Sequence, residues 1–216
     1  MSFASPSCRR TFMILAVWLL FGVPAHATTL LGMDIDQVAG GAELVFEGRV
    51  IAVIPQEDTA GTISTYVTFE IVDVLKGDYD GATVELKFLG GTVNGRMTEV
   101  SGLRLPGLGE QGIYFVESLT TDMVNPLLGW SQGHYLIQTD EAGTRRVTTS
   151  ERAPVVAVQP MAQVPAAIRK PQTLVQEDGA AAAGVATEES PLLIERALTV
   201  DEFKTRIRAL LESQAP

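Results

Sequence analysis

The pattern G-x-S-x-G, which holds the nucleophile of α/β-hydrolases, occurs at residues 129–133 with Ser131 at its centre. That chemistry needs a strand before the serine, a helix after it and a histidine base from elsewhere in the chain. Here His134 follows only three residues later, at the start of an expected strand, and Asn125-Pro126 precede the pattern. The context favours a turn bounded by glycines. A small serine hydrolase using Ser131 and His134 remains the alternative.

Two acidic patterns suggest a metal site, and local structure explains both. Asp78-Tyr79-Asp80-Gly81 begins like a calcium-binding EF-hand loop, but Leu89 stands where that loop needs a bidentate glutamate. Asp34 and Asp36 precede a short apolar segment and fit the role of helix-capping residues. We therefore assign no metal-binding residue, no cofactor and no catalytic residue.

Two further groups of side chains are candidates for acid–base chemistry or recognition. The first group falls on the outward faces expected for neighbouring strands, where solvated carboxylates are usual: Glu47, Glu70 and Glu85. The second is an aromatic cluster near one loop end: Trp130, His134 and Tyr135. If this cluster is exposed, it is an interaction surface; if it is buried, it fills the core. The sequence leaves both roles open.

The composition excludes several classes of protein. The 216 residues carry a net charge of −10, which argues against DNA or RNA as the main partner, because phosphates require clustered basic residues. The chain has one cysteine, Cys8, so it forms no disulfide framework and no cysteine-based zinc or haem site. Its length suits one sizeable core with an appendage.

The first 27 residues have the order of a secretory signal peptide. Arg9 and Arg10 precede an apolar run from Phe12 to Val23, and Ala25-His26-Ala27 forms a cleavage signal before Thr28. The run is shorter than the roughly 20 residues that span a bilayer. We expect a periplasmic or extracellular protein without a membrane span after cleavage. The paired arginines leave the general secretory and twin-arginine routes open.

After the signal, residues 28–150 form the expected main domain. A short helix is expected within 28–41, and the hydrophobic pattern then takes the period of two that is typical of strands. Clusters of Gly, Pro and Asp separate the alternating runs. We expect strands over these ranges: 44–54, 63–74, 83–89, 96–100, 111–118, 133–140 and 145–150. Their spacing favours an antiparallel barrel or sandwich over alternating strands and helices.

The composition changes after residue 150. Residues 151–191 are rich in Ala, Pro and Gln and have no sustained apolar period, which predicts a flexible, low-complexity linker. An extra edge strand over 153–158 is an option within it.

Helical order returns in residues 192–216. Thr199 and Glu202 fit a capping box, and an apolar stripe follows on one helix face: Phe203, Ile207, Leu210 and Leu211. We expect an amphipathic helix over 199–211. Docking on the strands is its favoured role, and binding to a separate partner is the alternative.

Several segments together resemble a known family. The markers are Phe46-Glu47-Gly48-Arg49-Val50, a long strand that ends at Lys76-Gly77, a strand at 83–86, and the step Gly109-Glu110 before the strand at 111–116. In this order they resemble secreted bacterial proteins built on the netrin-like, tissue-inhibitor-of-metalloproteinase-like OB barrel. The resemblance covers residues 44–118 well and 119–150 loosely.

The resemblance implies an OB-like β-barrel and a binding role more than a catalytic one. In the inhibitor family, a disulfide-pinned N-terminal cysteine presents its amine to a catalytic zinc. The mature chain would begin with Thr28-Thr29 and has no cysteine, so that mechanism does not carry over. We expect an exported non-catalytic interaction module, an accessory or inhibitor-like partner of another exported protein such as a protease. The alternatives are the serine hydrolase and a structural envelope protein.

Overall fold

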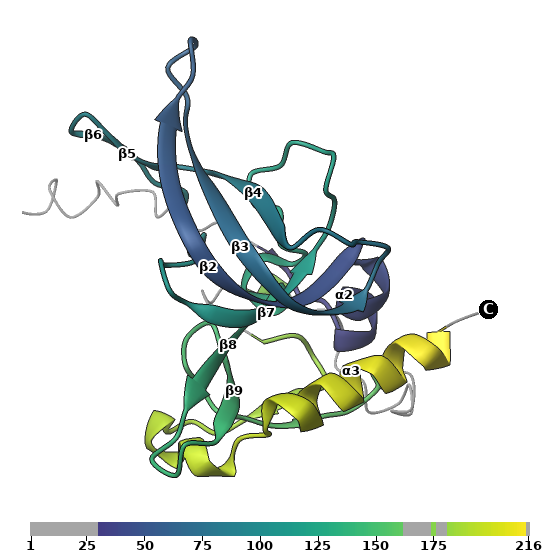
Figure 1. The fold of residues 1–216 in the computed structure, drawn as a ribbon. Coiled ribbons are helices and arrows are strands. Elements are labelled where there is room, and N and C mark those ends of the chain that lie inside the picture. Colours follow the sequence, from purple (N-terminus) through teal and green to yellow (C-terminus); the bar gives the residue numbers. More distant parts are fainter. Residues whose placement is uncertain (1–29, 162–173, 176–180, 215–216) are drawn as a thin grey trace, which may run out of the picture.

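The computed structural model describes residues 30–161, 174–175 and 181–214. The signal peptide expected at 1–27 and much of the expected linker lie outside the described residues. The described chain is mainly β, with a six-stranded antiparallel sheet and two short α-helices (Figure 1). The mainly β class expected from the alternation is therefore confirmed.

The strands of the sheet lie close to the ranges that the alternation predicts. In spatial order they are β4 (Thr83–Leu89), β3 (Ile63–Lys76), β2 (Leu44–Glu57), β7 (Gln111–Val116), β8 (His134–Thr139) and β9 (Arg145–Thr149). The outermost strands β4 and β9 do not pair with each other. The sheet is thus open, and the expected OB-like closure stays a prediction.

Smaller elements surround this sheet. Three short antiparallel pairs are β1 (Leu30–Leu31) with β11 (Leu174–Val175), β5 (Gly91–Val93) with β6 (Arg96–Thr98), and β10 (Val155–Val158) with β12 (Val185–Thr187). The helical elements are α2 (Ile35–Gly41), α3 (Val200–Gln214) and the 3-10 helices η1 (Trp130–Gly133) and η3 (Pro191–Arg196). Strand β10 falls within residues 153–158, where the sequence allowed an extra edge strand, and its Val155 and Val158 are buried. The described ends of the expected linker therefore belong to the packed molecule.

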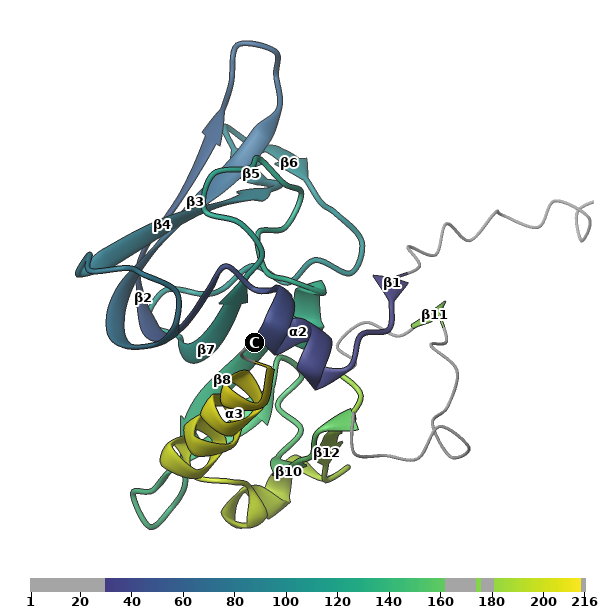
Figure 2. The same ribbon diagram turned by 90° about the vertical axis from the view of Figure 1, so that its right-hand side faces the viewer.

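Strands β2 and β3 form a long hairpin whose tip projects from the rest of the six-stranded sheet (Figures 1 and 2). Their register shifts at three places along β2, and such bulges bend a strand and increase its twist. At Gly48 a Cβ atom would lie 2.6 Å from the Phe46 ring and 3.0 Å from the Glu70 carbonyl oxygen. The bend therefore requires a glycine at this position.

The central strands bury both of their faces. One face carries the aromatic core, which includes Phe46, Phe69, Phe88 and Tyr114. The opposite face carries the helical core, where Val45 and Phe115 pack with residues from α2, α3 and β10. In Figure 2 the two helices lie together beside β7 and β8. Alternation along β2 and β7 thus sends neighbouring residues into two different cores.

Helix α2 forms where the sequence predicts it, and its two ends are closed by side chains. Asp34 accepts a hydrogen bond from the backbone N–H of Gln37, whose side chain accepts one from Asp34, completing a capping box. At the other end Lys76 Nζ donates to the carbonyls of Ala39 and Gly40 at 3.0 and 2.6 Å. Of the two aspartates considered as caps, Asp34 is the one that is used.

Helix α3 begins after the predicted cap and packs on its own chain. Glu202 accepts hydrogen bonds from the Thr199 N–H and hydroxyl at 2.8 and 2.9 Å, and the Glu202 N–H donates to the Thr199 hydroxyl. Phe203, Ile207 and Leu210 are buried in the helical core. The predicted amphipathic helix is confirmed, and it docks on the sheet.

Candidate functional site

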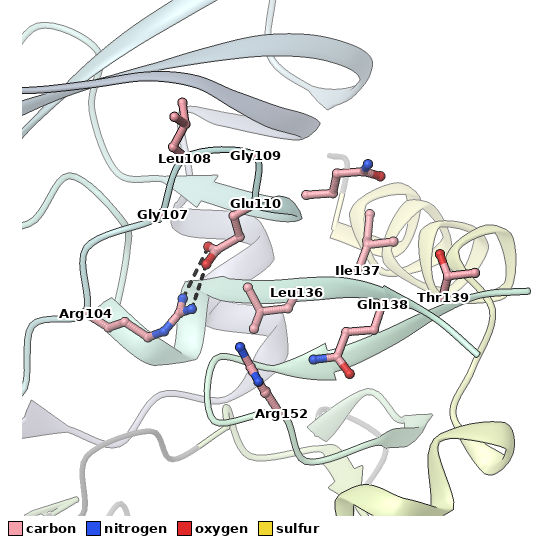
Figure 3. A pocket seen from close by; sticks show the side chains of 11 residues that line it. Arg104, Gly107, Leu108, Gly109, Glu110, Leu136, Ile137, Gln138, Thr139 and Arg152 are labelled. Atoms are coloured by element: carbon pink, nitrogen blue, oxygen red, sulfur yellow. Dashed lines mark hydrogen bonds and ion pairs between the residues drawn. The ribbon is translucent and has the colours of Figure 1, made fainter. Parts of the chain in front are cut away.

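A polar pocket of about 410 Å³ opens beside β7 and β8 (Figure 3). Its walls come from three segments: the loop that begins at Arg104 and leads into Gln111 of β7, the length of β8 from Leu136 to Thr139, and Arg152 in the turn after β9. Figure 3 shows the Arg104 guanidinium aimed at the Glu110 carboxylate, with Arg152 and Gln138 on the other side of Leu136. The pocket therefore brings Arg152 to the same site as Arg104 and Glu110, which lie together in one loop far from it in the sequence.

Glu110 is the centre of a partly buried polar cluster at this pocket. Its carboxylate accepts two hydrogen bonds from Arg104, at 3.2 and 2.6 Å, and one from His134 Nε2 at 2.9 Å. The His134 side chain is 1% exposed, and its ring stacks on Tyr114 with centroids 5.1 Å apart. The bidentate geometry fixes both Arg104 and the carboxylate in place.

The protonation states follow from burial and from these contacts. Burial alone would raise the pKa of Glu110, but the hydrogen bonds from His134 and Arg104 outweigh it and lower that pKa to about 2. Burial lowers the pKa of His134, because the charged ring loses its hydration. At pH 7 a neutral His134 therefore donates its Nε2 hydrogen to an ionised Glu110.

Arg152 enters the pocket from an unusual backbone conformation. Three hairpin turns share one pattern of backbone hydrogen bonds: 58–62, 140–144 and 149–153. In each turn the N–H of the first residue donates to the carbonyl oxygen of the fifth, and the N–H of the fourth residue donates to the carbonyl oxygen of the first. The fourth residue is Gly61 in the first turn and Gly143 in the second, with φ of +84° and +81°. In the third it is Arg152, with φ of +67°. An arginine thus occupies a left-handed position that favours glycine.

The pocket carries one uncompensated positive charge. Arg104 is neutralised by Glu110, whereas the Arg152 guanidinium has no ion-pair partner among the residues that the structure describes. A second hollow, of about 500 Å³, lies between α2 and the end of α3. There Asp34 caps α2 and Asp36 accepts the Met161 N–H, so those acids are already engaged. The first pocket is therefore the better candidate for a binding site.

The aromatic cluster considered from the sequence is largely interior. His134 and Tyr135 are buried, and Trp130 is half-buried. His134 and Tyr135 face opposite sides of the sheet. The His134 ring stacks on Tyr114 of the aromatic core, whereas the Tyr135 ring lies 5.0 Å from that of Phe203 in the helical core. Of the two roles left open, filling the core applies to His134 and Tyr135.

Ser131 lies in η1, which leads directly into β8. The G-x-S-x-G segment is thus a 3-10 turn before a strand, whereas a nucleophile elbow is a turn between a strand and a helix. Gly129 and Trp130 take positive φ angles of 63° and 59°. Gly133 does not, and it is constrained by space, because a Cβ atom there would collide with the Leu128 carbonyl oxygen.

The expectation that Glu47, Glu70 and Glu85 are all solvated is wrong for Glu47. Glu70 and Glu85 are exposed, but Glu47 is only 1% exposed. It lies on the face opposite the aromatic core, as alternation predicts, and α3 covers that face. Lys204 Nζ donates to Glu47 at 2.7 Å, and Arg145 donates to its other oxygen. The expectation failed because the pattern of one strand does not show which element packs on it.

Asp78 and Asp80 are exposed in the turn between β3 and β4. Within the described ranges, no group of three or more His, Cys, Asp or Glu side chains is placed to hold a metal ion. Over the same ranges, no helix combines the length and the apolar character needed to cross a bilayer.

The residues that line the pocket were missed from the sequence. Glu110 was noted only as part of a fold marker, and Arg104 and Arg152 lie in segments without a regular pattern. A signal for Arg152 exists in the two related turns, which both read D-x-A-G-T at 58–62 and 140–144. The third turn, Thr149 to Ala153, lacks this sequence. Only its hydrogen bonds reveal the shared conformation.

Fold and site define a mainly β protein with an open antiparallel sheet, two packed helices and a polar pocket at β8. No protein-family model, curated protein or solved structure matches the chain.

Proposed function

We propose that the chain is an exported, non-catalytic interaction module that binds another secreted protein as an accessory or inhibitor-like partner, for example of a protease. The observation that carries this proposal is the polar pocket with the Arg152 guanidinium, which has no ion-pair partner among the described residues. A cation in a turn at the edge of a pocket can recognise a partner without performing a reaction.

The proposal includes an OB-like scaffold. Strands β4, β3, β2, β7 and β8 have the neighbour order of an OB barrel opened between its third and fifth strands. OB barrels usually bind ligands through their strands and the loops between them. The pocket, formed by β8 and the loop before β7, is compatible with that use.

The proposal gives Ser131 and His134 no catalytic role. His134 is buried with Nε2 bonded to Glu110, and Ser131 lacks the strand-to-helix setting of a nucleophile elbow. A serine-reactive fluorophosphonate probe tests this part directly. Labelling of the wild type that is lost in Ser131→Ala would favour the hydrolase instead.

The binding role is tested by site-specific photo-crosslinking in the organism that encodes the chain. A photoreactive residue replaces Gln138 in the pocket, or Thr205 on the exposed face of α3 as a matched control. We expect a discrete adduct with an exported protein from position 138 and none from position 205. Equal labelling from both positions, or no adduct at all, would contradict the proposal.

A further inference from the structure

We propose that this pocket binds a carboxylate group of a polypeptide, either a chain terminus or an acidic side chain, with Arg152 as its anchoring cation. The inference rests on the proposed function and names the chemistry that the pocket recognises. It is carried by the charge balance of the pocket, the backbone of Arg152 and the side chains around it.

The charge balance selects a monoanion. Glu110 holds Arg104 through two hydrogen bonds and leaves Arg152 as the one cation without a partner on the described walls of the pocket. A single carboxylate would neutralise it. A phosphate dianion would bring a second negative charge into a pocket that already holds the ionised Glu110, and like charges repel.

The backbone of Arg152 indicates that its side chain is needed where it is. In the two turns with the same hydrogen bonds, glycine takes the left-handed position. A residue with a Cβ atom is strained there, and such strain is typical of functional sites. The turn directs the Arg152 side chain into the pocket beside Gln138 (Figure 3).

The other side chains of the pocket suit a peptide that carries the carboxylate. A carboxylate offers about four acceptor positions, of which an arginine fork fills two. The amides of Gln111 and Gln138 supply further donors within the same pocket. Leu108 on the pocket wall is 72% exposed and points away from Arg152 in Figure 3, so it offers an apolar contact to a part of the peptide further from the carboxylate. A small inorganic anion would leave this leucine uncovered.

The test is a calorimetric titration of the mature chain with defined probes. One probe is an acetylated tetrapeptide, Ala-Ala-Leu-Ala, with a free carboxylate as its only charge. The second is the same peptide as its amide, the third is an amide with one internal glutamate, and the fourth is inorganic phosphate. We expect at least one peptide carboxylate to bind, and the uncharged amide to bind about tenfold more weakly or not at all. The first and third probes distinguish a chain terminus from a side chain.

Variants of Arg152 locate the binding. Arg152→Gln should lose about tenfold or more in affinity for the carboxylate peptide, and Arg152→Lys should retain part of it. Arg152→Gly relieves the backbone strain, so it should fold well and still fail to bind. Arg206→Gln removes an equal charge from the exposed face of α3 and should bind like the wild type.

Three outcomes would overturn the inference: equal affinity for the acid and amide peptides, unchanged binding by Arg152→Gln, or tighter binding of phosphate than of every peptide. None of these outcomes changes the photo-crosslinking result, so the carboxylate proposal can fail while the proposed interaction function stands. If the pocket crosslinks to a partner but does not bind the carboxylate peptides, the proposed interaction function stands and the carboxylate assignment is wrong.

Discussion

The contact between Glu110 and His134 couples the pocket to the aromatic core. Glu110 is held by Arg104 on the solvent side and by His134 on the inner side, and His134 stacks on Tyr114. A change in protonation at this pair therefore affects both the pocket and the packing beneath it.

The first prediction concerns pH. Below about pH 6.5 the unfolded chain protonates His134, whereas burial keeps the folded ring neutral. The free energy of unfolding should thus fall as pH drops from 7.5 to 5, by up to about 1.4 kcal/mol per pH unit for this group. Glu110 adds a loss at lower pH, between its unfolded pKa of 4.5 and its folded pKa of about 2. Urea unfolding between pH 7.5 and 5 measures the His134 effect, and a series extended down to about pH 2 measures the Glu110 effect.

The control for this prediction is His134→Gln, which removes the group that titrates near neutrality. We expect this variant to be less stable at pH 7.5 but to change less between pH 7.5 and 5.5. A wild-type profile that is flat over that interval would show that the folded ring accepts the proton.

A second residue-scale prediction concerns the strain at Arg152. Glycine adopts φ of +67° freely, so Arg152→Gly should raise the free energy of unfolding by about 1 kcal/mol. Thermal melts provide the measurement. Arg145→Gly is unsuitable as a control, because it would also remove the ion pair between Arg145 and Glu47. Glu151→Gly, in the same turn without a positive φ, should not stabilise.

At the scale of elements, α3 is attached to the sheet by charge as well as by apolar contact. Lys204 bridges Glu47 on β2 and Asp73 on β3, at 2.7 and 2.8 Å, and Arg208 also contacts Asp73. Burial would raise the pKa of Glu47, but the hydrogen bonds from Lys204 and Arg145 outweigh it and lower that pKa. Glu47 therefore stays ionised beneath the helix.

The third prediction tests this attachment. Glu47→Gln removes the buried charge and its charged hydrogen bonds but leaves Lys204 paired with Asp73, so it should cost about 1.5–3 kcal/mol of stability. Glu70→Gln changes an exposed carboxylate of β3 in the same way and should stay within about 0.5 kcal/mol. Urea unfolding compares the two variants. Similar small effects would mean that α3 does not cover Glu47 in solution.

The fourth prediction concerns the packing of η1 before β8. Gly133→Ala should cost about 1–3 kcal/mol, because the new Cβ atom would collide with the Leu128 carbonyl oxygen. Gly107→Ala is the matched control, since its Cβ would meet only a Glu110 oxygen at 4.0 Å. Equal thermal melts for the two variants would contradict the close approach at Gly133.

For the whole molecule, we expect the two cores to form one cooperative unit, because β2 and β7 contribute to both. Val45 and Phe115 belong to the helical core, whereas Phe46 and Tyr114 belong to the aromatic core. A strand cannot leave one core without disrupting the other. The two helices and β10 thus cover one face of the open sheet.

The fifth prediction follows from this sharing. Phe203→Ala in the helical core and Phe69→Ala in the aromatic core should each cost about 3–5 kcal/mol, since both rings are fully buried. Each variant should still unfold in one transition when followed by both circular dichroism and tryptophan fluorescence. Separate transitions for the two signals would indicate that the cores unfold independently.

Local pattern was sufficient for much of the secondary structure. Strands β2, β3, β4, β7, β8 and β9 follow period-two alternation, and α2 and α3 begin at the capping boxes of Asp34 and Thr199. These features depend on residues within a few positions of one another, so the sequence shows them directly.

The partners of each face were decided only by the tertiary structure. Alternation placed Glu47 and Tyr135 on definite faces of their strands, but the helix that covers Glu47 is 157 residues further along the chain. The pocket likewise combines the loop pair Arg104 and Glu110 with Arg152, and no local spacing relates Arg152 to that pair. The sequence by itself determined where the chain forms strands and helices, because those depend on near neighbours. Packing between distant segments determined which charges are buried, which are paired and which remain available to a ligand.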